Sequence, residues 1–98
     1  MFTWLNSQAV RSDRGFEVEC MGQFDEEYRE GRRKVTVEVE RGLERGDQPC
    51  VIIATTAFRR WDGDPPGTIL PEEKQAQMLA NFREAMEFQG ISVVVGRG

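Results

Sequence analysis

The sequence predicts a single α+β domain: an antiparallel four-stranded meander, one long helix at about 71–89 packed on the sheet, and a short C-terminal strand at 91–95. Three observations predict this fold. Apolar and polar residues alternate in short runs between residues 16 and 41, apolar residues recur at helical spacing after Pro71, and a branched apolar run, ISVVV, follows Gly90. Because 98 residues are close to the commonest domain size, residues 1–98 are expected to form one domain.

Three strands are predicted from alternation of period two. In the first, GFEVECM, the residues expected to be buried are Phe16, Val18 and Cys20, with glutamates on the other face. The more polar stretch 24–29 is expected to be an edge strand, where charge discourages unwanted pairing. The third strand, at 34–41, points three valines to one face and polar residues to the other.

The remaining strand of the meander, at 50–58, reads CVIIATTAF and is apolar on both faces. Such a strand is expected to be covered on both sides or to lie centrally in its sheet. The stretch 42–49, with two glycines, an aspartate and a proline, is expected to be a loop. Residues 1–14 are a lead-in segment whose structure the pattern does not determine.

A corner rich in proline and glycine, DGDPPG at 62–67, separates the strands from the helix, because two prolines there remove backbone donors. Pro71 suits a first helical turn, and Glu72 and Glu73 match the positive end of the helix dipole. Gly90 is expected to end the helix. The face predicted to be buried carries Met78, Leu79, Phe82, Ala85, Met86 and Gln89.

The acidic balance of the chain limits the classes of partner. Seventeen acidic and thirteen basic residues give a net charge of -4, so attraction to phosphate backbones or anionic lipid is disfavoured and a basic protein partner is favoured. No apolar run is long enough for a membrane span, and residues 1–10 lack the pattern of a signal peptide. A cytoplasmic location is therefore expected.

The sequence contains no histidine, which removes the usual general base and the usual zinc ligand. No phosphate-binding glycine loop is present, and DGD at 62–64 is interpreted as a turn because the later ligands of a calcium loop are missing. Neither an enzyme nor a cofactor or metal site is therefore predicted. Cys20 and Cys50 are expected to be reduced thiols, although a disulfide between them stays open.

Two pairs of carboxylates project at i and i+2 from predicted strand faces: Glu17 with Glu19, and Glu38 with Glu40. Such pairs occur in glycosidases and two-metal nucleases, but alternation favours a solvated sheet face. The basic residues expected to neutralise it across strands are Arg29, Arg32, Arg33, Lys34 and Arg41.

A runner-up function is a single-stranded nucleic-acid-binding domain of ββββα type. Arg59, Arg60 and Trp61 offer groups that stack on bases, and Phe24 and Tyr28 are candidates for an aromatic face. Against this hypothesis, the predicted strand faces carry glutamate where such a domain needs lysine or arginine. The structural alternative places Trp61 over the start of the helix, with Arg60 paired locally.

The segments RRWDGDPPG and PEEKQAQMLANFREAMEFQGISVVV resemble immunity protein family 74 of bacterial polymorphic toxin systems, with the strands GFEVEC and KVTVEVE matching more loosely. The resemblance implies a cytoplasmic protein without a reaction of its own, which binds a cognate toxin domain and blocks it.

Under this hypothesis, the binding face is the glutamate-bearing surface of the sheet. Glu17, Glu19, Glu38 and Glu40 would steer a basic partner, and Tyr28 would be an aromatic anchor. Homodimerisation through the valine-rich final strand is left open, because an uncovered strand edge invites pairing.

Overall fold

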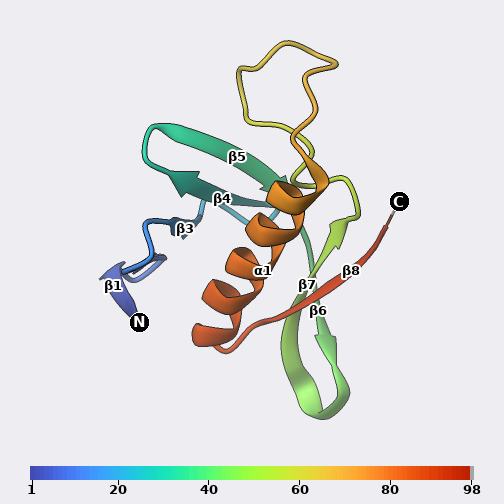
Figure 1. Ribbon diagram of the computed structural model, residues 1–98. Coiled ribbons are helices and arrows are strands. Elements are labelled where there is room, and N and C mark those ends of the chain that lie inside the picture. Colours follow the sequence, from blue (N-terminus) through green and yellow to red (C-terminus); the bar gives the residue numbers. More distant parts are fainter. Residues whose placement is uncertain (98) are drawn as a thin grey trace.

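The computed structural model describes residues 1–97, which contain eight strands, one α-helix and a short 3-10 helix (Figure 1). The strands are β1 (Phe2–Asn6), β2 (Ala9–Ser12), β3 (Glu17–Cys20), β4 (Asp25–Glu30), β5 (Arg33–Glu38), β6 (Glu40–Glu44), β7 (Gln48–Ala54) and β8 (Ser92–Arg97). The helices are η1 (Arg45–Asp47) and α1 (Glu72–Phe88).

Strands β1 to β5 form an antiparallel sheet in the order of the sequence. The predicted α+β class, with one α-helix and a C-terminal strand, is confirmed, but this sheet has five strands instead of four. The lead-in residues 1–14 supply β1 and β2, a hairpin in which Trp4 lies opposite Val10. Val10 in turn lies opposite Val18 of β3, so the hairpin extends the buried face of the meander.

The prediction that residues 24–29 form an edge strand is wrong, because β4 lies between β3 and β5. The polar residues that suggested an edge are compensated within the fold. Glu27 accepts a hydrogen bond from Arg29 at 2.7 Å, and Glu26, almost fully buried, accepts one from Arg41 at 2.8 Å. Charge in a strand therefore predicts an edge only when no partner charge is supplied from elsewhere.

Strands β6, β7 and β8 form a second, three-stranded sheet. The strand expected at 50–58 lies centrally in its sheet, as its two apolar faces predicted, but it is not the fourth strand of the meander, and β7 ends at Ala54. β6 runs antiparallel to β7, whereas β8 runs parallel to it. The expected loop at 42–49 is mostly regular structure, because β6 continues to Glu44 and β7 begins at Gln48. The expected strand at 34–41 is divided at Val39, whose N–H donates to the carbonyl of Phe24 at 2.8 Å where the chain passes between the sheets.

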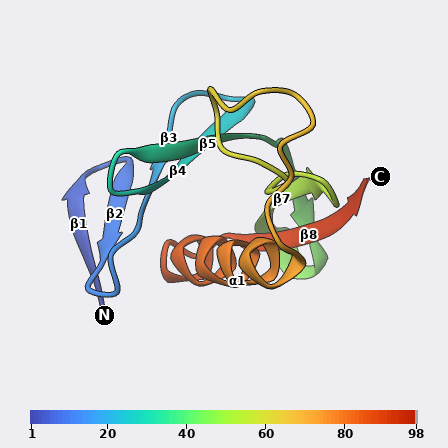
Figure 2. The same cartoon turned by 45° about the horizontal axis from the view of Figure 1, so that its top comes forward.

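Helix α1 packs on one side of both sheets, against β2 and β3 of the first and β8 of the second (Figure 2). Its buried residues are Met78, Phe82, Ala85 and Met86, all on the predicted face. They meet the inner face of the first sheet, which consists of Val10, Val18, Tyr28, Val35 and Val37, and Val51 and Ile53 of β7. One core therefore joins the helix to both sheets.

Neither helix in residues 1–97 has the length and apolar character that a bilayer-spanning segment needs. Cys20 and Cys50 are free thiols, as expected.

Candidate protein-binding site

The face of the first sheet that points away from α1, called here the outer face, carries most of the charged residues of β3, β4 and β5. The register places Arg11 opposite Glu17, Glu17 opposite Arg29, and Arg29 opposite Lys34. In the neighbouring rows Glu19 lies opposite Glu27, and Asp25 opposite Glu38. Five carboxylates and three cations therefore share this face.

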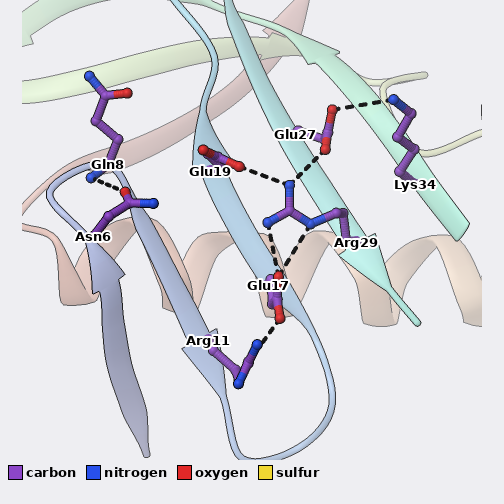
Figure 3. A network of polar contacts seen from close by, with 8 residues as sticks. All are labelled: Asn6, Gln8, Arg11, Glu17, Glu19, Glu27, Arg29 and Lys34. Carbon is purple, nitrogen blue, oxygen red and sulfur yellow. Dashed lines mark hydrogen bonds and ion pairs between the residues drawn. The ribbon is translucent and has the colours of Figure 1, made fainter. Parts of the chain in front are cut away.

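Arg29 stands at the centre of the outer face and binds three carboxylates at once (Figure 3). Its Nη1 lies 2.9 Å from Glu19 and 2.7 Å from Glu27, and its Nη2 lies 2.9 Å from Glu17. Arg11 adds a second contact to Glu17 at 2.8 Å. The predicted neutralisation of Glu17 and Glu19 by arginines across strands is confirmed.

These contacts change the titration of the groups involved. The hydrogen bond from Arg29 lowers the pKa of the Glu17 carboxyl below its ordinary value, although partial burial opposes the change. Partial burial likewise opposes the charge of Arg29, but its hydrogen bonds to Glu27, Glu17 and Glu19 raise the pKa of its guanidinium. The charges of Glu17 and Glu19 are thus neutralised by arginines of the same sheet, so these residues are poor candidates for steering a partner.

Tyr28 does not lie on the outer face, so its assignment as an exposed aromatic anchor is wrong. By alternation along β4 it shares the inner face with Val18 and Val35, and its exposed fraction is 0%. Its hydroxyl donates to Glu30 and accepts a hydrogen bond from Asn81 of α1 at 3.0 Å. Burial raises the pKa of this hydroxyl, which stays neutral and structural.

A groove lies where the two sheets meet, on the side away from the helix. Its volume is about 450 Å³, and it is lined by Phe24, Asp25, Glu38, Val39, Glu40, Ile52 and Ala54. A second hollow of about 320 Å³ shares Asp25, Glu38 and Ala54 with it and adds Thr36, Thr56 and Ala57. These residues together are called the junction groove. It contains Glu38 and Glu40, two of the residues predicted to bind a partner, whereas Glu17 and Glu19 lie outside it.

The junction groove contains a like-charge pair that the fold does not neutralise. Asp25 and Glu38 are direct partners in the register of β4 and β5, and neither takes part in an ion pair within residues 1–97. Like charges directly opposite each other destabilise a sheet. This arrangement contrasts with the rest of the outer face, where each glutamate contacts a cation.

Phe24 stands beside these carboxylates and is 64% exposed, so its ring is the accessible aromatic group of the groove. Its backbone is held in place from the second sheet. Arg41 of β6 donates to the carbonyls of Gly22 and Gln23, both at 2.9 Å, and Val39 donates to the carbonyl of Phe24. From the sequence, Phe24 was proposed only as part of an aromatic face for binding nucleic acid, and not as a protein-binding residue. Its position just after Gly22, in a turn between two strands, is the signal that marks it as exposed.

The corner residues do not form a stacking platform. Trp61 is buried, stacks on Tyr28 with a centroid distance of 6.5 Å, and lies beneath Lys74 of α1. Arg60 donates to the carbonyl of Asp64 at 2.6 Å. The structural interpretation of this corner is confirmed for Trp61 and Arg60, so Trp61 is not available to stack on a base.

No set of metal-ligating side chains is found within residues 1–97. The aspartates of the DGD turn are engaged elsewhere. Asp62 accepts from the hydroxyl of Thr36 at 2.6 Å, and Asp64 binds Arg33 at 2.7 Å.

Comparison with known proteins gives no further assignment: no family model, no curated protein and no solved structure matches this chain.

Proposed function

We propose that this chain is a non-enzymatic protein-binding module, an immunity protein that binds and inhibits a basic bacterial toxin domain through the junction groove. The observation that carries the proposal is the Asp25–Glu38 pair, two carboxylates held opposite each other without a cation, beside an exposed aromatic ring. A binding partner that brings a lysine or arginine into the groove relieves the repulsion that the free protein bears.

The aromatic part of the groove supplies affinity. Exposed aromatic residues carry more binding energy than charges at the rim of an interface, and Phe24 is presented by a turn whose carbonyls are already hydrogen-bonded. A fixed anchor loses little conformational freedom on binding. The apolar floor, formed by Ile52 and Ala54, suits the aliphatic stem of a long basic side chain.

The biological role comes from the resemblance to immunity protein family 74 and from electrostatics. Toxin domains that attack nucleic acid need basic surfaces, so an acidic inhibitor is steered to the site where the phosphates would bind. The same acidity disfavours the runner-up function, since a phosphate backbone would meet the Asp25 and Glu38 carboxylates of the groove.

Two substitutions test the role of the groove. The protein is titrated calorimetrically against a basic toxin domain encoded beside its gene, and growth of cells expressing that toxin is measured. We expect Glu38→Arg to abolish protection, and Phe24→Ala to weaken binding at least about tenfold, or roughly 1.4 kcal/mol. Glu87→Arg, an equal charge reversal on the exposed face of α1, is the control and should bind like the wild type.

Three outcomes contradict the proposal. One is a chain that neither binds nor neutralises any toxin-like product of the neighbouring genes. Another is full protection by the Glu38→Arg variant, which would place the binding surface elsewhere. The last is binding to labelled single-stranded DNA that weakens steeply with salt, which would favour the nucleic-acid function instead.

A further inference from the structure

The two sheets of this protein end in four edge strands, β1 and β5 in the first sheet and β6 and β8 in the second. Edge strands present unpaired backbone groups that pair readily with another chain, so soluble proteins cover them or place charges along them. Comparing the four edges shows which one is unprotected.

The edge at β5 is covered by the corner that precedes the helix. The N–H of Asp62 donates to the carbonyl of Lys34 at 2.8 Å, and the carboxylate of Asp62 accepts from the N–H of Thr36 at 2.9 Å. Asp62 therefore satisfies a backbone acceptor and a backbone donor of β5 that an added strand would otherwise bind. No further strand can pair with β5 at this point.

The second sheet protects its edges by other means. At β8, the guanidinium of Arg83 from α1 donates to the carbonyl of Val93 at 2.7 Å and covers part of the edge. At β6, three of five residues are charged: Glu40, Arg41 and Glu44. Charged edges disfavour pairing with a second copy of the same strand, because such pairing brings charges of like sign close together.

The edge at β1 has neither kind of protection. Its sequence, FTWLN, contains no charged residue, and four of its five residues are exposed. Trp4 is 49% exposed and Leu5 is 40% exposed. Phe88, at the end of α1, is also exposed and packs its ring against Trp4 with a centroid distance of 5.9 Å. An apolar patch thus lies directly beside an uncovered strand edge.

We infer that β1 is a dimerisation edge, at which the β1 strands of two copies of this chain pair antiparallel across a twofold axis. The chosen occupant is a second copy because an interface of this symmetry brings each residue close to its own counterpart. In a chain with a net charge of -4, repulsion between two copies is smallest where the paired strand carries no charged residue. Among the four edge strands, only β1 has no charged residue.

Pairing of this kind joins two five-stranded sheets into one continuous sheet and buries Trp4 and Phe88 near the axis. β1 and β5 are opposite edges of the first sheet, and the junction groove lies at the β4–β5 side. The dimer therefore leaves both grooves open, and the inference does not depend on the proposed function. It also places self-association at β1 instead of the valine-rich final strand that the sequence suggested.

Sedimentation velocity over a wide range of protein concentration tests the inference. We expect the wild-type chain to shift from monomer to dimer as concentration rises, and Trp4→Lys and Thr3→Lys to weaken the dimer at least tenfold. Leu43→Lys introduces the same charge at an exposed apolar residue of β6 and is the matched control. It should dimerise like the wild type. Far-UV circular dichroism establishes whether each variant is folded.

Hydrogen exchange keeps the test decisive if a β1 variant does not fold. In the wild-type chain, amides of β1 should exchange at least tenfold more slowly at high than at low protein concentration, while those of β6 should not change. A wild type that stays monomeric up to millimolar concentration overturns the inference. A dimer that Leu43→Lys disrupts and Trp4→Lys leaves intact also overturns it, as does protection that appears at β6 or β8 instead of β1.

Discussion

Arg29 shows how a single residue decides which carboxylates of a sheet are available to a partner. Its guanidinium contacts Glu17, Glu19 and Glu27, and all four side chains are largely shielded from solvent. Because the three carboxylates surround one cation, removing that cation leaves them repelling one another across neighbouring strands. The stability of the outer face therefore depends on Arg29 more than on any one of its acidic partners.

Replacing Arg29 by methionine, which keeps the apolar stem, should lower the free energy of unfolding at pH 7 by about 2 kcal/mol. This magnitude lies between exposed ion pairs, at up to about 1 kcal/mol, and fully buried ones, at roughly 3–5 kcal/mol. Urea denaturation at several pH values gives the measurement. Lys34→Met is the control on the same face: Lys34 contacts Glu27 at 3.5 Å from an exposed position and should cost little.

The effect of Arg29→Met should depend on pH in a defined direction. Since the folded-state pKa of Glu17 lies below its ordinary value, its contribution to stability is present above that ordinary value and is lost as pH falls through the folded pKa. The difference between wild type and variant should therefore shrink at acidic pH. A difference that stays constant from pH 7 to pH 3 would show that Arg29 acts through packing alone.

The same residues explain why the candidate site was only half predictable. Alternation correctly placed Glu17, Glu19 and Glu38 on one sheet face, because the side-chain period of a strand is two. Alternation along a single strand does not say which face the helix covers, and Tyr28 was therefore assigned to the wrong face. Nor does it reveal which carboxylates have a cation, since that depends on the cross-strand register.

Among the elements, α1 was the most predictable, because its buried stripe, acidic first turn and terminal glycine all indicate the same helix. The strand at 34–41 was predicted as one element but is divided at Val39, where the chain changes sheets. The hairpin of β1 and β2 was not identified at all. Its strands are short. The hairpin is fixed by pairing of β2 with β3 and by ring contacts such as Phe2 with Phe16, which local sequence does not encode.

Phe82 is the residue through which α1 holds the core together. It is fully buried at the centre of the helix and lies 5.6 Å, centroid to centroid, from Phe58. Phe82→Ala should lower the free energy of unfolding by about 3–5 kcal/mol, as truncation of a core aromatic does. Thermal or urea unfolding measures the loss, with Glu87→Ala on the exposed face of the helix as control. A loss below about 1 kcal/mol, the size expected of a surface change, would contradict the assigned packing.

At the scale of the whole molecule, polar contacts of Arg41 join the two sheets in addition to the shared core. Arg41, from the second sheet, reaches Glu26 of the first at 2.8 Å and also lies 3.3 Å from the thiol of Cys20. Glu26 is 1% exposed, and its Oε1 has no hydrogen-bond partner among the described residues. A buried carboxylate with only one oxygen hydrogen-bonded lowers the stability of the fold. Glu26 lies where Arg41 contacts both the first sheet and the turn that carries Phe24.

Glu26 should make the whole domain less stable as pH rises. Burial raises the pKa of Glu26, with Arg41 and Cys20 opposing the change, so the folded state binds this proton more tightly than the unfolded chain. Its contribution is fully present below the ordinary pKa of 4.5 and is lost as pH rises through the folded value, by about 1.4 kcal/mol for each pH unit between the two pKa values.

The Glu26→Gln substitution removes this titration. We therefore expect the unfolding free energy of the wild type, minus that of Glu26→Gln, to fall between pH 4 and pH 7. A difference for Glu26 that rises with pH would mean that attraction to Arg41 outweighs desolvation, and that the contact between the sheets stabilises the charged form.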